Sequence, residues 1–158
     1  MGLSFKPLRK FLHDYPALPA FALALVALFA KTTMTSLLQI AVRFKTRRFS
    51  APEDARWAGV PMAGVEGGLL QRCSSVWRND TENLPFFIAL ALGYVLLGAS
   101  LESAGVLFGL YVARRYLHTA AYLRGLQPWR ALFYLGGLAV CGVIAMRIIL
   151  LALAARIA

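Results

Sequence analysis

The sequence predicts an all-α integral membrane protein in which four transmembrane helices form a single bundle over residues 1–158. Hydrophobic residues make up 59% of the chain and charged residues 15%, and the mean hydropathy is +0.64. This composition is too apolar for an ordinary soluble domain. Four predicted helices are each long enough to cross a hydrocarbon core of ~30 Å at ~1.5 Å per residue. They lie at about 17–42, 69–97, 106–123 and 129–155.

The first predicted helix, 17–42, begins beside Pro16 and Pro19, because proline is tolerated in a first helical turn. It is as long as a full span and has no clear cleavage site, so we expect it to remain as a helix and not to be a signal peptide. Lys31 lies near its middle, and a charge at that depth is expected to pair with a carboxylate inside the bundle. Residues 43–68 are predicted to form an extramembrane loop, since Pro52 limits helix continuation and several glycines follow.

The second predicted helix begins with three polar turns before it becomes apolar. Arg78 and Glu82 are i,i+4 neighbours, while Ser75 and Asn79 share a face with Glu82. Next to a membrane-length segment, such side chains need a water-filled or protein-lined cavity. The alternative is that they are solvated residues at a helix end that only reach the interface.

A second polar stripe lies at the end of the third predicted helix. Arg114, His118 and Tyr122 follow one another at i, i+4 and i+8, with Arg115 beside them. In an antiparallel bundle, this end meets the start of the second helix and the start of the fourth. The sequence therefore predicts one polar site formed by Arg78, Asn79, Glu82, His118, Tyr122 and Arg130.

The net charge of +10 does not indicate a nucleic-acid partner, because the basic residues flank apolar segments instead of forming one polar module with interleaved aromatic residues. Seven lysines and arginines lie in or beside the 43–68 loop and the connection near residue 128, against four near the termini. The positive-inside rule then places both connections, and the site, on the cytoplasmic side. The membrane is predicted to be either a bacterial inner membrane or the endoplasmic reticulum. Cys73 and Cys141 have no CxxC spacing, so no metal site is predicted.

The predicted site indicates the chemistry of its ligand. Several guanidinium groups, one carboxylate and neutral hydrogen-bonding groups suit a small molecule with more than one carboxylate and at least one ammonium. Glutathione has this charge pattern and also a thiol. A guanidinium near the sulfur would favour the thiolate, which is the stronger nucleophile. We expect the second substrate to be lipophilic and to arrive through the membrane lipid.

Motifs over nearly the whole chain resemble the MAPEG superfamily, the membrane-associated proteins of eicosanoid and glutathione metabolism, in the branch of glutathione transferases and prostaglandin E synthases. The most specific is Arg-Asn-Asp-x-Glu-x-x-Pro-Phe at residues 78–86, followed by His118 and Tyr122. Further matching stretches are residues 16–21, Arg43 with residues 48–54, and Arg115 with residues 118–123.

The resemblance implies a four-helix protomer in a homotrimer, with glutathione held between adjacent subunits. It implies that the six residues of the predicted site come from one subunit, and that the neighbouring subunit contributes Arg43, Phe49 and Asp54. Arg130 matches the arginine that stabilises the thiolate, and Asp54 is the second predicted catalytic residue.

Two positions depart from this branch. Ser75 stands where an arginine is common, and Ala131 stands where prostaglandin E synthase has a serine directly after the arginine matched by Arg130. The sequence therefore predicts a membrane-bound glutathione transferase or peroxidase of the detoxifying kind, which activates glutathione against lipophilic electrophiles or lipid hydroperoxides. The alternatives are a glutathione-dependent isomerase of the prostaglandin E synthase kind, or a non-catalytic membrane scaffold or lipid-binding protein with the same fold.

Overall fold

The computed structural model describes residues 6–64 and 67–157, and the described residues are all helix, turn or coil. Residues 1–5, 65–66 and 158 of the predicted 1–158 domain lie outside the described ranges, including two residues of the predicted 43–68 loop. The helices are α1 (Lys6–Asp14), α2 (Leu18–Thr46), α3 (Pro52–Trp57), α4 (Gly68–Leu96), α5 (Leu101–Arg124) and α6 (Trp129–Ile157).

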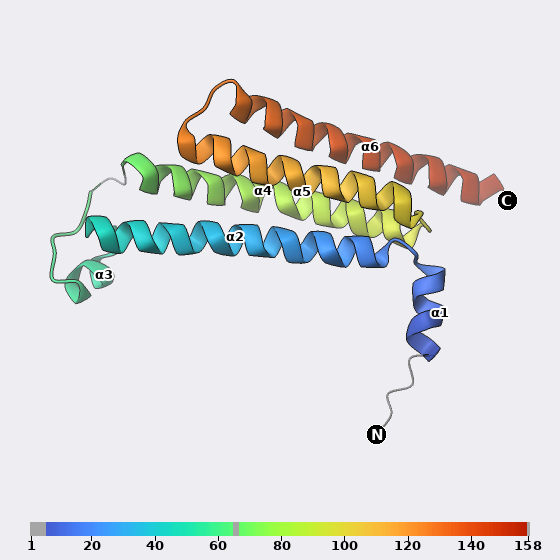
Figure 1. The fold of residues 1–158 in the computed structure, drawn as a ribbon, viewed down its shortest axis with the longest axis horizontal. Coiled ribbons are helices and arrows are strands. Elements are labelled where there is room, and N and C mark those ends of the chain that lie inside the picture. Colours follow the sequence, from blue (N-terminus) through green and yellow to red (C-terminus); the bar gives the residue numbers. More distant parts are fainter. Residues whose placement is uncertain (1–5, 65–66, 158) are drawn as a thin grey trace.

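Four long helices, α2, α4, α5 and α6, run side by side (Figure 1). Helices α4 and α5 each contact both α2 and α6, so they form the centre of the arrangement. The buried core contains a cluster of aromatic side chains among aliphatic ones. The Phe87 ring stacks on Tyr111 with centroids 3.8 Å apart, and Phe108 meets Phe87 edge to face at 5.8 Å. Figure 1 also shows that the C-terminal ends of α2 and α5 and the N-terminal ends of α4 and α6 lie at one end of the arrangement.

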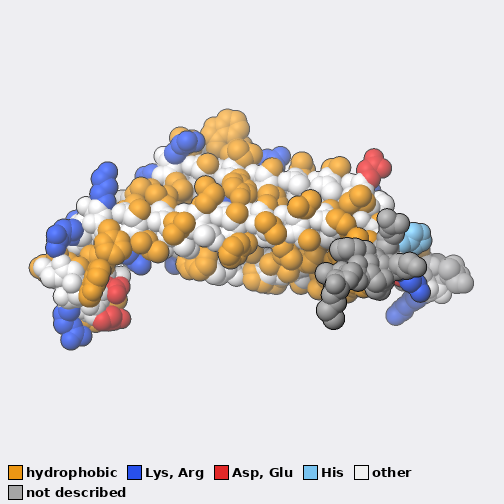
Figure 2. All heavy atoms as spheres, turned by 60° about the horizontal axis from the view of Figure 1, so that its bottom comes forward, with side chains coloured by type: hydrophobic (Ala, Val, Ile, Leu, Met, Phe, Trp, Pro, Cys, Tyr) orange, Lys and Arg blue, Asp and Glu red, His pale blue; other side chains and the backbone are white. Residues whose placement is uncertain are grey.

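The outer faces of the long helices are strongly apolar. Leu23, Phe29 and Phe86 each leave more than two thirds of their surface exposed. On the face in Figure 2, hydrophobic side chains cover the length of the helices, and the visible acidic side chains lie near the two ends. Helices α2 and α6 are long and apolar enough to cross a membrane. A lipid environment explains such a surface, because it would be unusually apolar for a monomer in water.

Two predicted boundaries were wrong. The first helix continues four residues beyond Val42 to Thr46 and stops at Arg47, whose φ of 50° is left-handed. The third helix begins at Leu101 and not at 106. Ser100 caps it, since its side chain accepts a hydrogen bond from the Ser103 N–H. Gly105 lies inside this helix and does not end it, because one glycine in a helix interior costs only about 1 kcal/mol relative to alanine.

The segments outside the long helices contain two short helices that the sequence analysis did not predict. Helix α3 lies within the predicted 43–68 loop. It starts at Pro52 and carries Glu53 and Asp54 in its first turn, which is where proline and acidic residues stabilise a helix. Helix α1 forms part of the N-terminal lead-in and turns away from the bundle axis, at the end opposite α3 (Figure 1).

Candidate functional site

A polar cavity of about 280 Å³ opens where α4, α5 and α6 meet, at the end of the bundle that carries α3. We call this the polar cavity. Four of the predicted site residues line it together with three that the sequence analysis did not assign to the site. The lining residues are Asn79, His118, Tyr122, Gln127, Arg130, Ala131 and Tyr134.

The turn between α5 and α6 brings the end of α5 and the start of α6 together beside the polar cavity. Gly125 ends α5 with a φ of 70°, a left-handed conformation that glycine adopts without strain. The Arg72 guanidinium of α4 packs against it, and its Nη1 atom would lie 2.8 Å from a Cβ at this position. Arg72 Nη1 also donates to the Leu123 carbonyl at 3.0 Å. The start of α4 is thereby tied to the end of α5.

His118 links α5 to the first turn of α6. Its Nδ1 lies 3.1 Å from the Arg130 carbonyl oxygen. Because a carbonyl can only accept, Nδ1 carries a proton, and in the neutral ring Nε2 keeps its lone pair. Nε2 is buried and has no hydrogen-bond partner among the described residues. A ligand in the polar cavity could therefore donate a hydrogen bond to it.

The Arg130 guanidinium lies over the Tyr122 ring, with its central carbon 4.5 Å from the ring centroid. With the Gln127 side-chain oxygen turned toward it, this oxygen accepts from Arg130 Nη2 at 2.7 Å and from Nε at 3.1 Å. The ion pairs of the described residues do not include Arg130. Its positive charge is therefore held in place by neutral groups, which leaves it available to an anionic ligand.

A buried cluster of charged side chains orients the Asn79 side chain. Arg115 Nη2 donates to Asn79 Oδ1 at 2.8 Å and also to Asp80 Oδ1, while Lys31 Nζ donates to Asp80 Oδ2. We call Lys31, Asp80 and Arg115 the buried triad. Since Arg115 occupies the oxygen end of the Asn79 amide, the amide nitrogen is the end left to donate to a ligand. The prediction that Lys31 pairs with a carboxylate is confirmed.

Arg78 and Glu82 do not line the polar cavity. Both are exposed on α4, and among the described residues no ion pair joins them. Ser75 lies one turn before Asn79 and is half-buried. Arg114 belongs to the predicted polar stripe, but it turns toward α6, where its guanidinium lies 5.9 Å from the centroid of the Phe133 ring.

Arg43, Phe49 and Asp54 lie at the same end of the bundle, on α2, α3 and the segment between them, and they do not line the polar cavity. Phe49 is buried, with its ring 5.7 Å from that of Phe44 and its carbonyl accepting from the Ala63 N–H at 2.9 Å. Arg43 is half-buried, and Asp54 is exposed in the first turn of α3. Within one chain, these three residues are separate from Arg130.

Gln127 and Tyr134 line the polar cavity but were not among the predicted site residues. Tyr134 follows Arg130 by four residues, so helical spacing could have placed the two on the same face. Gln127 had no comparable signal, because its position depends on the course of the turn between α5 and α6.

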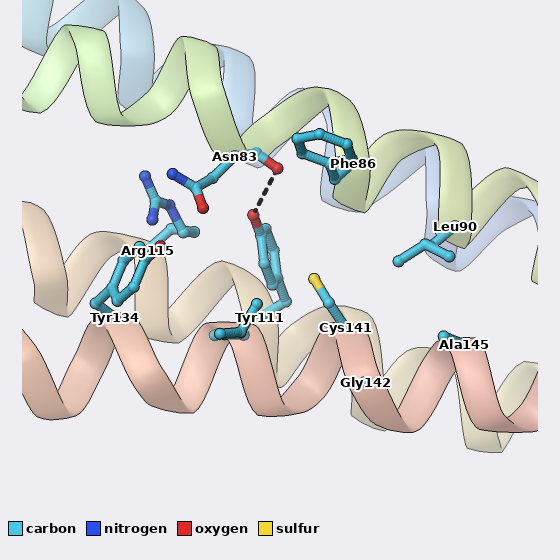
Figure 3. Close-up of a pocket in the computed structure, with 11 residues that line it drawn as sticks. Asn83, Phe86, Leu90, Tyr111, Arg115, Tyr134, Cys141, Gly142 and Ala145 are labelled. Atoms are coloured by element: carbon cyan, nitrogen blue, oxygen red, sulfur yellow. Dashed lines mark hydrogen bonds between the residues drawn. The ribbon is translucent and has the colours of Figure 1, made fainter.

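A second cavity, of about 400 Å³, adjoins the first and is lined mainly by apolar side chains of α4, α5 and α6 (Figure 3). We call it the side cavity. Tyr134 lines both cavities, and Arg115 and Asn83 stand near one end of the side cavity. The Tyr111 hydroxyl donates to the Asn83 carbonyl at 3.5 Å, and Phe86, Leu90 and Cys141 form apolar walls farther along. An apolar molecule in this space would have one end close to the polar cavity.

Comparison with known proteins identifies the family. Residues 21–150 match the MAPEG family. The chain belongs to this family. It is 31% identical to human prostaglandin E synthase over 144 residues, which cover 90% of this chain and 95% of the human protein. It is 33% identical over 135 residues to prostaglandin E synthase of Macaca fascicularis, covering 85% of this chain and 89% of that protein.

A relative with a different name has a comparable percentage identity. The chain is 32% identical over 147 residues to microsomal glutathione S-transferase 1 of Rattus norvegicus, covering 89% of this chain and 94% of the rat protein. The resemblance that the sequence motifs indicated is thus confirmed at the level of the family.

Proposed function

We propose that this MAPEG protein is a membrane-bound, glutathione-dependent enzyme that transfers glutathione to lipophilic electrophiles or uses it to reduce lipid hydroperoxides. The observation that carries the proposal is the Arg130 guanidinium, held by Tyr122 and Gln127 without an acidic partner among the described residues. A relative named for glutathione transfer supports the choice of cosubstrate.

Arg130 stabilises the glutathione thiolate in the polar cavity, because a fixed positive charge favours the ionised sulfur. His118 Nε2 accepts a hydrogen bond from a donor group of glutathione, and the Asn79 amide nitrogen donates to one of its oxygens. In the transfer reaction, the sulfur forms a bond to the electrophilic carbon and the leaving group departs with its electron pair. The lipophilic substrate occupies the side cavity, with its reactive end near Tyr134.

The complete site is formed in a homotrimer of four-span protomers, with Arg78 and Glu82 joining the residues of the polar cavity. Arg43, Phe49 and Asp54 of one protomer complete the polar cavity of its neighbour. Their place at the correct end of the bundle, but away from the cavity of their own chain, supports this arrangement. The exposed apolar faces of the long helices support burial against lipid and other protomers. The site faces the cytoplasm, in agreement with the distribution of lysine and arginine.

The ultraviolet difference spectrum of the thiolate tests the proposed role of Arg130. We expect a saturable thiolate band when glutathione is added to the detergent-purified protein, and no band with S-methylglutathione, which has no ionisable thiol. Arg130→Leu should lose the band. Arg147→Leu is the matched control, because Arg147 lies on the same helix outside the polar cavity. A band of full height in Arg130→Leu would remove Arg130 from the mechanism.

Complementation tests the shared site. We expect Arg130→Leu and Asp54→Ala each to be inactive alone. Coexpressed, they form mixed trimers in which some sites combine an intact Arg130 with an intact Asp54, so partial activity should return. If mixed trimers form but stay inactive, the proposal that Arg130 of one subunit and Asp54 of its neighbour share one site is wrong.

A glutathione-dependent isomerase is the second candidate, because several similar proteins are named prostaglandin E synthase. Ala131 lines the polar cavity with a methyl group at the position where the resemblance indicates a serine in that branch. We expect little isomerisation of a prostaglandin endoperoxide by this chain, and a gain on Ala131→Ser. Analysis of the products that the native chain and Ala131→Ser form from the endoperoxide decides between the transferase or peroxidase and the isomerase.

A further inference from the structure

A third cavity, of about 360 Å³, lies between α2 and α5 and shares no lining residue with the polar cavity or the side cavity. We call it the α2–α5 cavity. We propose that it binds the head of a single-chain lipid amphiphile that carries a carboxylate, such as a free fatty acid. Its volume is within the range of about 300–1,000 Å³ typical of small-molecule sites. This inference does not depend on the proposed enzymatic function.

An unpartnered hydroxyl marks the place of the ligand head. Thr119 lines the α2–α5 cavity, is only 9% exposed, and its Oγ1 has no hydrogen-bond partner among the described residues. In helices, threonine and serine can donate to the carbonyl four residues earlier. The side chains of Thr35, Ser36 and Thr46 in α2 all do so.

The other two hydroxyl groups that line this cavity already have hydrogen-bond partners. The Tyr116 hydroxyl donates to the Ala27 carbonyl at 2.8 Å, and Thr35 Oγ1 donates to the Lys31 carbonyl at 3.1 Å. A buried hydroxyl without a partner is unfavourable, and lipid offers no hydrogen bond to replace it. Thr119 is therefore the group that a ligand oxygen would satisfy.

The buried charges indicate that this oxygen belongs to an anion. The α2–α5 cavity is also lined by Lys31, and the buried triad contains two cations and one carboxylate. Lys31 Nζ has three protons, and its described bonds involve only Asp80. A ligand carboxylate would accept from Lys31 and Thr119 and would balance the second positive charge.

The surroundings of the cavity suit a single alkyl chain. Met34, Leu38, Ala120 and Leu123 supply apolar wall, and Met34 is mostly exposed on the outside of α2. Within the described residues, α2 and α6 are the helices long and apolar enough to cross a membrane, so a ligand reaches this wall on α2 from lipid. The carboxylate then lies toward Lys31 and Thr119 with the chain along the outer part of the cavity.

Photolabelling tests the proposal on the full chain. Delipidated protein in detergent is irradiated with a fatty acid that carries a diazirine near its carboxyl end, and labelled peptides are identified by mass spectrometry. We expect labels within residues 31–38 and 116–123. Oleic acid should compete at least about tenfold better than oleyl alcohol, because only the acid supplies the negative charge.

Three variants distinguish this site from general lipid contact. Thr119→Val keeps the shape but removes the hydroxyl, so the apparent affinity for the fatty acid should fall about tenfold. Ala120→Phe fills the cavity and should abolish labelling there. Thr32→Val is the matched control, since Thr32 bonds within its own helix and does not line the cavity, and it should label like the native chain. Labels spread evenly over the exposed faces of α2 and α6, equal competition by the alcohol, or unchanged binding by Thr119→Val would each overturn the proposal.

Discussion

The net charge of the buried triad predicts how much stability is lost when one of its members is replaced. Asp80 is 1% exposed, Lys31 2% and Arg115 3%, so all three are removed from solvent. Asp80→Asn leaves two buried cations without a carboxylate. Breaking such a pair by removal of one partner costs about 3–5 kcal/mol. For a chain of this size, that corresponds to a fall in the melting temperature of roughly 10 °C.

Lys31→Met should be much milder, although it also removes one member of the triad. Asp80 keeps its bond from Arg115, the remaining pair is electrically neutral, and the methionine side chain fills the space of the lysine stem. The lost hydrogen bond is offset in part because a desolvated cation is no longer buried. We expect a net loss of about 1 kcal/mol, which is a fall of roughly 3 °C.

Thermal unfolding of the two variants in the same detergent measures this difference. Size-exclusion chromatography below the transition establishes that each variant starts from the same assembled state. If Lys31→Met loses as much stability as Asp80→Asn, the reasoning from net charge is wrong. The loss would then come from broken hydrogen bonds, whichever partner is removed.

Three further predictions concern the sites. We expect the Glu82 carboxylate to pair with the ammonium group of glutathione, so Glu82→Ala should weaken glutathione binding about tenfold. Calorimetry that shows unchanged affinity would contradict this pairing. Gly125→Ala should lower the free energy of unfolding by more than about 1 kcal/mol, because φ is 70° and a Cβ would meet Arg72. Unfolding measurements test this. Gly64→Ala is the control, since a Cβ at residue 64 would meet nothing within 4 Å. Gly142→Leu places a side chain in the side cavity, so kcat/KM for a lipophilic electrophile should fall about tenfold while glutathione binding is retained. An unchanged kcat/KM would show that the lipophilic substrate does not bind in the side cavity.

Local sequence was sufficient for the features that depend on helical periodicity and composition. The order of the long helices follows from the apolar segments and the glycine and proline residues between them. Antiparallel connection then brings Asn79, His118, Tyr122 and Arg130 to one end of the bundle, where they line a common cavity. The pairing of Lys31 with a carboxylate was predictable because an isolated charge at that depth would be too costly.

The tertiary structure decided which face of each helix turns inward. Periodicity places Arg114 and Arg115 about 100° apart on α5, but only packing against α4 and α6 turns Arg115 toward Asp80 and Arg114 toward Phe133. In the same way, the rotation of α4 buries Asp80 and leaves Arg78 and Glu82 exposed. The unpartnered hydroxyl of Thr119 also depends on this rotation. Spacing along one helix fixes angles between its own side chains, whereas the rotation of that helix is set by the core that it shares with its neighbours.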